Sequence, residues 1–201
     1  MLRIRPIGTI DVVQSAFIVG HADTAQREVR MQLMLPTPVE HAWQALTDGE
    51  RTISWLGRLD VSTMTDGGHF GLWHDEAVRS RHTVLQWHPR RLLTLTWDFP
   101  DERPSQVTFA LAERITSTAT LSVHHQDLDD AVSYAAGWHR HLQYLEAHLR
   151  GGDLPIDDFW TDYDRLVELY EKHKRTGHEL PVRAMPAVAP HTTAPAWTAD
   201  T

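Results

Sequence analysis

A strand ends and a short helix begins within residues 36–48, which read PTPVEHAWQALTD. Thr37 is a favourable N-cap because its hydroxyl can accept a hydrogen bond from the amides of the first turn. Pro38 then takes the first helical position, where the N–H that it lacks is not needed. Glu40 stands three residues after Thr37 and completes a capping box. The apolar residues repeat at the spacing of one helical face, namely Val39, Ala42, Trp43 and Leu46.

Alternating apolar residues on both sides of this helix predict an antiparallel sheet. Residues 29–35 alternate and are interpreted as the preceding strand, and residues 52–55 follow the helix as a second short helix. Strand-like runs separated by short turns come next, at 70–74, 78–87, 92–99, 107–112 and 116–125. Strands joined so closely form an antiparallel meander.

Two amphipathic helices follow the strands and complete an α+β fold. The first is expected over about 129–150 and the second over about 158–174. The second carries an apolar face of Phe159, Trp160, Tyr163, Leu166, Val167 and Tyr170.

Composition excludes several classes of protein. The chain has 201 residues, which suit one domain with extensions, and no cysteine, which excludes disulfides and thiolate catalysis. The formal net charge of −8 argues against a nucleic-acid binder. No apolar run approaches the roughly 20 residues of a membrane span, so none is expected. The N-terminus lacks the pattern of a signal peptide, and we expect a cytoplasmic protein.

Four motifs in this order resemble one branch of the START-like (SRPBCC, helix-grip) superfamily. They are residues 36–48 with Trp55 shortly after, GGHF at 67–70, HPRRLLTLTW at 88–97 and GWHRHLQYLEAHLRG at 137–151. The branch is homologous to the activator of the 90-kDa heat-shock protein ATPase. The resemblance implies a curved antiparallel sheet wrapped around a long C-terminal helix, with two short helices after the first strand and one extra C-terminal helix.

The resemblance also sets the expected domain limits. Residues 27–152 would form the helix-grip domain, and residues 153–175 would add a helix packed on it. Residues 1–26 are expected to be an extension that contributes an edge strand or an arm. Residues 176–201, rich in proline and alanine without periodicity, are expected to be a flexible tail.

Members of the superfamily hold ligands in an apolar cavity between the sheet and the long helix. Strand parity places Leu95, Trp97, Phe109, Val123 and His125 on the face toward that helix. Ordinary core packing of the tryptophans is the alternative. The candidate ligand-binding residues are therefore Trp55, Trp73, His82, Leu95, Trp97, Phe109, Val123, His125, Trp138 and Leu142.

The 14 histidines do not form a recognisable metal motif. His124 and His125 are adjacent on a strand and point to opposite faces, while His139 and His141 do not converge on a helix. The sequence has no HExxH, no GxSxG and no phosphate-binding loop. We therefore expect no metal and no cofactor, and we assign no catalytic residue; His82 and His125 are the best polar groups for a cavity.

Three functions remain open. The first is binding of a small hydrophobic or aromatic molecule in the cavity, without detected catalysis. The second is a co-chaperone-like module that regulates a partner protein, with a homodimer as one form of partnership. The third is a cyclase or hydrolase that acts on a ligand in the same cavity.

Overall fold

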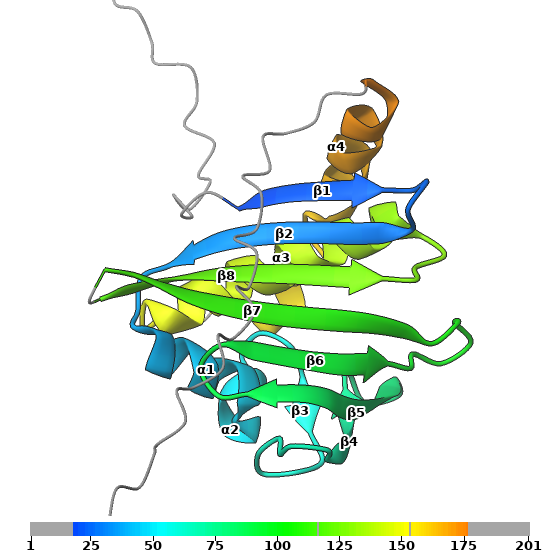
Figure 1. The fold of residues 1–201 in the computed structure, drawn as a ribbon. Coiled ribbons are helices and arrows are strands. Elements are labelled where there is room, and N and C mark those ends of the chain that lie inside the picture. Colours follow the sequence, from blue (N-terminus) through cyan, green and yellow to red (C-terminus); the bar gives the residue numbers. More distant parts are fainter. Residues whose placement is uncertain (1–17, 116, 153, 177–201) are drawn as a thin grey trace, which may run out of the picture.

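The computed structural model describes residues 18–115, 117–152 and 154–176. These residues form eight strands in one antiparallel sheet of order β1-β2-β8-β7-β6-β5-β4-β3 (Figure 1). The strands are β1 Val19–Asp23, β2 Glu28–Leu35, β3 Arg58–Leu59, β4 His69–Trp73, β5 Arg79–His88, β6 Leu92–Trp97, β7 Ser105–Ile115 and β8 Thr118–Gln126. The helices are α1 Val39–Thr47, α2 Gly49–Thr52, α3 Ala131–Leu149, the 3-10 turn η1 Ile156–Asp158 and α4 Tyr163–Thr176.

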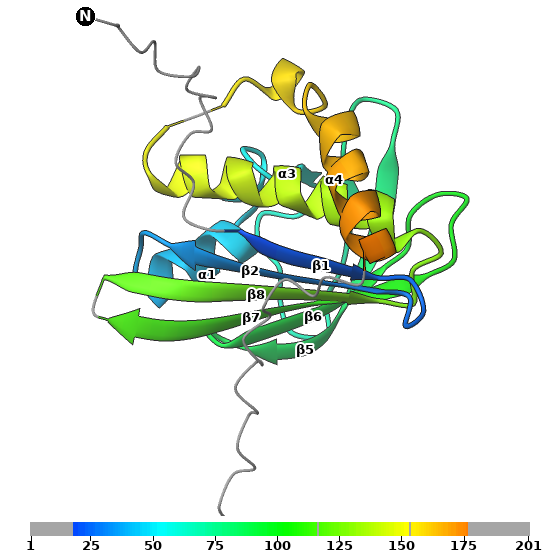
Figure 2. The same ribbon diagram turned by 90° about the horizontal axis from the view of Figure 1, so that it is seen from above.

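The curved sheet and the long helix α3 form two layers. Figure 2 shows α3 and α4 on one side of the sheet, and α4 packs against both α3 and the edge strand β1. α1 and α2 follow β2, as expected of two short helices after the first strand of the domain. The result is the α+β helix-grip arrangement that the sequence predicts.

Strand alternation creates the core between these layers. In β6, Leu93, Leu95 and Trp97 are all buried, and in β8 Leu121 and Val123 are buried in the same way. Trp43 of α1 is 7% exposed and packs edge-on to Trp87 with ring centroids 4.9 Å apart. The parity of the central strands is therefore confirmed.

The predicted entry to α1 is wrong in detail. Pro38 has an extended ψ of 154°, so it is the N-cap itself, and no side chain caps this helix. The Thr37 hydroxyl lies 3.4 Å from Nδ1 of His41, and Glu40 pairs with Arg90 at 3.2 Å instead of closing a capping box. The second short helix also begins earlier than predicted, because the Asp48 carboxylate accepts a hydrogen bond from the amide of Glu50.

The C-terminal helix begins later than predicted. η1 and a turn occupy residues 156–162, and α4 starts at Tyr163. Phe159, Leu166 and Tyr170 are buried as expected, whereas Trp160 is 64% exposed. Trp160 lies in the turn, so the helical phase that predicted its burial does not apply there.

Arg140 of α3 fastens this extension to the domain. The residue is 8% exposed, and its side chain donates to the backbone carbonyls of Phe159 at 2.7 Å and Asp158 at 2.9 Å. These bonds satisfy carbonyls at the end of a 3-10 turn that has little secondary structure of its own. A buried charge with several acceptors thus holds the start of the C-terminal segment on α3.

Candidate functional site

Aromatic and imidazole rings occupy the space between the sheet and α3. The aromatic layer consists of His82 on β5, Trp97 on β6, Phe109 on β7, His125 on β8 and Trp138 on α3, none more than 4% exposed. The Trp97 ring centroid lies 5.4 Å from Trp138, 4.6 Å from His82 and 5.7 Å from His125. Four neighbouring strands and one helix therefore each supply a ring to this layer.

His125 has both ring nitrogens in hydrogen bonds. Its Nδ1 accepts from Nε1–H of Trp138 at 3.0 Å, so Nε2 carries the hydrogen and donates to the Ser105 hydroxyl at 2.8 Å. Ser105 in turn donates to the backbone carbonyl of Trp97 at 3.2 Å. These bonds give a buried imidazole a complete set of partners.

His82 has the opposite arrangement. Its Nδ1 lies 2.8 Å from the carbonyl of Thr96, so this nitrogen donates and Nε2 must accept from the Ser80 hydroxyl at 2.7 Å. Ser80 then accepts from Nε2–H of His74 at 2.8 Å. The hydrogen bonds thus run in one direction, from His74 through Ser80 and His82 to Thr96.

Burial keeps these histidines uncharged near neutral pH. Desolvation lowers the pKa of His82 and of His74 to about 4, and that of His125 to about 3. The charges of neighbouring histidines lower the pKa values of His74 and His125 further. The aromatic layer is consequently an apolar environment with polar atoms but without a fixed positive charge.

The indole N–H of Trp97 differs from the other polar groups of the layer. Within the described part of the chain, its Nε1 is fully buried and has no hydrogen-bond partner of ordinary geometry. The Tyr134 hydroxyl donates its hydrogen to Glu102 at 2.5 Å, and its oxygen stays available as an acceptor for this indole. Burial raises the pKa of Tyr134, whereas its hydrogen bond with Trp97 acts to lower it.

Three half-buried rings form the rim of the aromatic layer: His74, Phe99 and Tyr134. His74 lies 5.0 Å from Phe99 and 5.9 Å from Trp97, and Tyr134 lies 4.8 Å from His125. The layer therefore meets solvent at this rim, where its rings are partly exposed.

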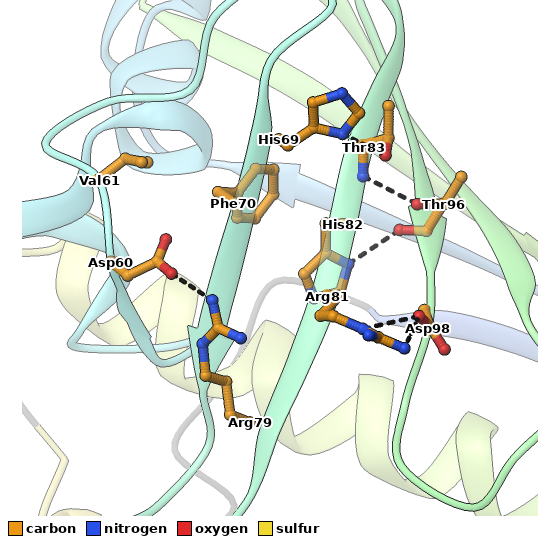
Figure 3. A pocket seen from close by; sticks show the side chains of 10 residues that line it. All are labelled: Asp60, Val61, His69, Phe70, Arg79, Arg81, His82, Thr83, Thr96 and Asp98. Carbon is orange, nitrogen blue, oxygen red and sulfur yellow. Dashed lines mark hydrogen bonds and ion pairs between the residues drawn. The ribbon is translucent and has the colours of Figure 1, made fainter.

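A polar cleft lies across β4, β5 and β6 (Figure 3). Its volume is about 530 Å³. Two ion pairs cross it, Asp60 with Arg79 at 2.5 Å and Asp98 with Arg81 at 2.9 Å. Its lining consists of Asp60, Val61, His69, Phe70, Arg79, Arg81, His82, Thr83, Thr96 and Asp98.

Gly71 lets Arg79 lie across β4 to reach Asp60. A Cβ at this glycine would come within 2.2 Å of the Arg79 guanidinium. The amide of Gly71 also donates to Asp60 at 2.7 Å, which lowers the pKa of that carboxyl together with Arg79. One side of the cleft is thus built on a position without a side chain.

The other side lies where the ladder between β5 and β6 opens. Arg81 and Asp98 exchange backbone hydrogen bonds, but at the next pair the amide of Thr83 donates to the Thr96 side chain. The Thr96 carbonyl accepts from His82 instead, as described above. This opening exposes one part of His82 to the cleft while its ring stays in the aromatic layer.

The structure brings together most of the predicted residues. His82, Trp97, Phe109, His125 and Trp138 form the aromatic layer, and Leu95, Val123 and Leu142 are buried in the same core. Of the ten, His82 alone is among the residues that line the cleft. Their role as ligand contacts stays a prediction.

Two predicted residues lie apart. Trp55 is 2% exposed and donates its indole hydrogen to the carbonyl of Ala45 at 2.9 Å. Trp73 stands on the face of β4 opposite to Phe70, between the guanidinium groups of Arg58 and Arg79. It therefore faces away from the layer between sheet and helix.

The charged cleft and the rim were not predicted from the sequence. Arg79 and Arg81 alternate along β5 and so share a face, which was a usable signal. Asp60 and Tyr134 gave no comparable signal, because only the curvature of the sheet and the docking of α3 bring them to these places.

Among the residues that the structure describes, no three histidine, aspartate or glutamate side chains gather in a way that could hold a metal ion. None of the helices placed in the structure is both long and apolar enough to cross a membrane.

Solved structures with this architecture come from several bacteria. CalU16 from Micromonospora echinospora is 22% identical, matches 79% of this chain and 98% of its own, and superposes with a TM-score of 0.64, which shows the fold. The BPP1335 protein from Bordetella parapertussis is 31% identical over 79% of this chain and 92% of its own, with a TM-score of 0.59. DynU16, from the dynemicin biosynthetic locus, is 26% identical over 63% of this chain and 48% of its own, with a TM-score of 0.58.

The sequence was also compared with curated proteins and with family models. No curated protein matches the chain. The model of one family, described as activator of Hsp90 ATPase homolog 1-like protein, matches residues 36–150. This range spans the elements from the start of α1 to the end of α3, the same elements that carry the aromatic layer and the cleft. The chain therefore belongs to the activator of Hsp90 ATPase homolog 1-like family, a branch of the START-like superfamily.

Proposed function

We propose that this protein binds a small, mainly apolar molecule with a ring system against the aromatic layer between the sheet and α3. The observation that carries the proposal is the Trp97–Trp138 pair, with ring centroids 5.4 Å apart, at the centre of a layer whose rim rings are partly exposed. Indole rings offer broad apolar contact together with a polar atom that can orient a ligand. A ligand would reach them by displacing Phe99 and Tyr134 of the rim.

Two further findings support this proposal. Domains of the START-like superfamily hold ligands between the sheet and the long helix, and the aromatic layer lies in that position. DynU16, a structural neighbour, is described as a protein of the dynemicin biosynthetic locus.

The hydrogen bonds argue against general-base catalysis by the interior histidines. A general base needs a free lone pair within reach of the substrate. In His125 that lone pair accepts from Trp138, and in His82 it accepts from Ser80. The geometry therefore favours binding over a cyclase or hydrolase that uses either imidazole.

A neutral fluorescent probe, N-phenyl-1-naphthylamine, tests the proposal. We expect saturable binding with one site per chain, seen as a rise in probe fluorescence and confirmed by native mass spectrometry. Trp138→Leu should weaken binding about tenfold, because a ring contact worth about 1 kcal/mol and apolar area are lost.

Trp160→Leu is the matched control, since this exposed tryptophan lies outside the layer. It should leave the affinity unchanged. The proposal fails if the folded protein shows no saturable binding, or if both variants weaken binding to the same extent.

A further inference from the structure

We propose that the polar cleft across β4, β5 and β6 is a second binding site, and that Arg81 and Asp98 select a small dipolar molecule there. The chemical class that fits is an amino acid with an apolar side chain, whose carboxylate meets Arg81 and whose ammonium group meets Asp98. The inference goes beyond the proposed function, because the cleft and the aromatic layer lie on different faces of the sheet.

The position of the cleft follows from the alternation of β5. Arg81 and Thr83 line the cleft, and they alternate with the buried residues Ser80, His82 and Val84. Successive side chains of a strand point to opposite faces, and the His82 ring belongs to the aromatic layer under α3. The side chains of Arg81 and Thr83 therefore stand on the face of the sheet away from α3.

The first wall of the cleft is fixed before any ligand arrives. Both carboxylate oxygens of Asp60 are engaged, since one accepts from the amide of Gly71 at 2.7 Å and the other pairs with Arg79 at 2.5 Å. A Cβ at Gly71 would fill the place of the Arg79 guanidinium. The hollow between the walls has a volume of about 530 Å³, within the usual range of small-molecule sites. A preformed wall lowers the entropic cost of binding.

The second wall keeps unused hydrogen-bonding atoms. Nε and Nη2 of Arg81 both donate to the same oxygen of Asp98, Oδ2, at 3.0 and 2.9 Å. Among the described residues, Oδ1 of Asp98 and Nη1 of Arg81 make no hydrogen bond. The Arg81 side chain is 73% exposed and that of Asp98 31% exposed. This pair thus presents one free acceptor and one free donor side by side.

The charge of the cleft favours a ligand that carries both signs. The lining holds two guanidinium groups, Arg79 and Arg81, and two carboxylates, Asp60 and Asp98, whose charges cancel. A lone anion on Arg81 would lie beside the Asp98 carboxylate, and a lone cation on Asp98 would lie beside the guanidinium, and such like-charge contacts are costly. A dipolar molecule avoids both contacts. It also makes charge-assisted hydrogen bonds, which are stronger than those of an uncharged amide.

The rest of the lining accepts an apolar group. Val61 and Phe70 belong to the cleft, and Figure 3 shows Val61 and Asp98 on opposite sides of it with Phe70 between them. A ligand whose charged groups lie on Arg81 and Asp98 therefore directs its side chain over Phe70 toward Val61. This arrangement favours an amino acid with an apolar side chain.

Three related compounds test the inference by isothermal titration of the full chain. They are L-phenylalanine, 3-phenylpropionate, which lacks the ammonium group, and phenethylamine, which lacks the carboxylate. Phenylalanine should bind about tenfold more tightly than either analogue, as expected for one charge-assisted hydrogen bond more.

Two variants assign the two charges of the ligand. Arg81→Gln should remove the preference for phenylalanine over phenethylamine, and Asp98→Asn should remove the preference over 3-phenylpropionate. Arg165→Gln is the matched control, because Arg165 forms an exposed ion pair with Asp162 outside the cleft. It should keep both preferences.

A spectroscopic readout on the unmodified protein covers the case in which a variant does not fold. The amide of Thr83, which donates to the Thr96 side chain in the cleft, should shift its ¹H–¹⁵N resonance with phenylalanine. The indole resonance of Trp138 in the aromatic layer should stay in place.

The outcomes separate the two proposals. The inference is overturned if phenylalanine shows no saturable binding, if either analogue binds as tightly, if Arg81→Gln and Asp98→Asn keep both preferences, or if the Trp138 resonance shifts in place of that of Thr83. None of these results touches the proposed function, which the naphthylamine probe and Trp138→Leu test independently.

Discussion

His125 shows how a histidine becomes part of a core. It is fully buried, and it accepts from Trp138 and donates to Ser105. Strand parity predicts that it faces inward, but parity does not predict its partners, because Ser105 and Trp138 come from another strand and from α3. The alternation of the strand thus predicts correctly that the His125 side chain points into the core. Its hydrogen-bond partners depend on the tertiary structure.

His125→Phe should therefore destabilise the fold although it keeps a ring in place. The change leaves the Trp138 N–H without its acceptor and Ser105 without its donor, which we expect to cost about 2–3 kcal/mol. Urea unfolding measures the effect. His88→Phe, at an exposed position, should change stability by less than about 0.5 kcal/mol. Equal stability of His125→Phe and the unmodified protein would contradict a stabilising role of the hydrogen bonds that His125 makes with Trp138 and Ser105.

Two glycines should respond to alanine in opposite ways. A Cβ at Gly71 would collide with the Arg79 guanidinium, whereas a Cβ at Gly137 in α3 meets nothing within 4 Å. Gly71→Ala should cost about 1 kcal/mol and release Arg79 from Asp60, a partly exposed pair of modest strength. Gly137→Ala should stabilise the protein by up to about 1 kcal/mol, the difference in helix propensity.

Thermal or urea unfolding of both variants shows whether the free energy of unfolding falls for Gly71→Ala and rises for Gly137→Ala. Asp60→Asn made on top of Gly71→Ala should cost less than Asp60→Asn alone, because the ion pair is already lost. Full additivity would show that Arg79 still reaches Asp60 across the alanine.

At the scale of elements, the docking of η1 and α4 depends on Arg140. Arg140→Met keeps much of the apolar stem but leaves the carbonyls of Asp158 and Phe159 without donors. We expect a loss of about 2–3 kcal/mol. Hydrogen exchange should rise in η1 and α4 and stay unchanged in β6 to β8.

Arg165→Met serves as the control, since Arg165 is exposed and its ion pair with Asp162 lies on the surface. Its exchange pattern should match that of the unmodified protein. Increased exchange throughout the sheet of Arg140→Met would mean that the extension is part of one cooperative unit with the domain.

Sequence patterns predict the elements better than their ends. The strands and α3 follow from apolar periodicity, which reflects burial on one face. The entry to α1 and the start of α4 depend on local backbone angles and hydrogen bonds. The extended conformation of Pro38 and the turn around Trp160 override the propensities that predicted a capping box and a longer helix.

For the molecule as a whole, buried histidines should make stability fall in acid. Burial lowers the pKa of His74, His82, His139 and His141 to about 4 and that of His125 to about 3. In the unfolded chain these groups have a pKa near 6.5, so below that pH the unfolded state binds more protons than the folded one. Stability is therefore full above about pH 6.5 and falls as the pH drops toward 4.

Each such histidine contributes up to about 1.4 kcal/mol per pH unit to this fall. We expect the free energy of unfolding to drop by at least about 3 kcal/mol between pH 6.5 and 5, measured by urea titration. His139→Gln should make the dependence shallower by about one proton. A stability that is constant from pH 7.5 to 5 would contradict burial of the histidines in the neutral form.

The sequence predicts which residues make up the candidate site, but it does not predict their contacts and hydrogen bonds. Parity and the family resemblance both favour Trp97, Phe109, His125 and Trp138 as neighbours between sheet and helix. The neighbourhood of Trp97 and Tyr134 depends on how α3 packs on the sheet. The cleft depends on the opening between β5 and β6, which no pattern in one strand can reveal.

The opposite hydrogen-bond directions of His82 and His125 have a spectroscopic consequence. One imidazole carries its hydrogen on Nδ1 and the other on Nε2, so a long-range ¹H–¹⁵N spectrum should show two neutral rings with mirror-image nitrogen shifts. Both patterns should persist at pH 5, where a solvent-exposed imidazole is already protonated. The protein thus carries a built-in reporter of its own interior, in which an exchange of the two patterns would reveal a rearranged core before any loss of secondary structure.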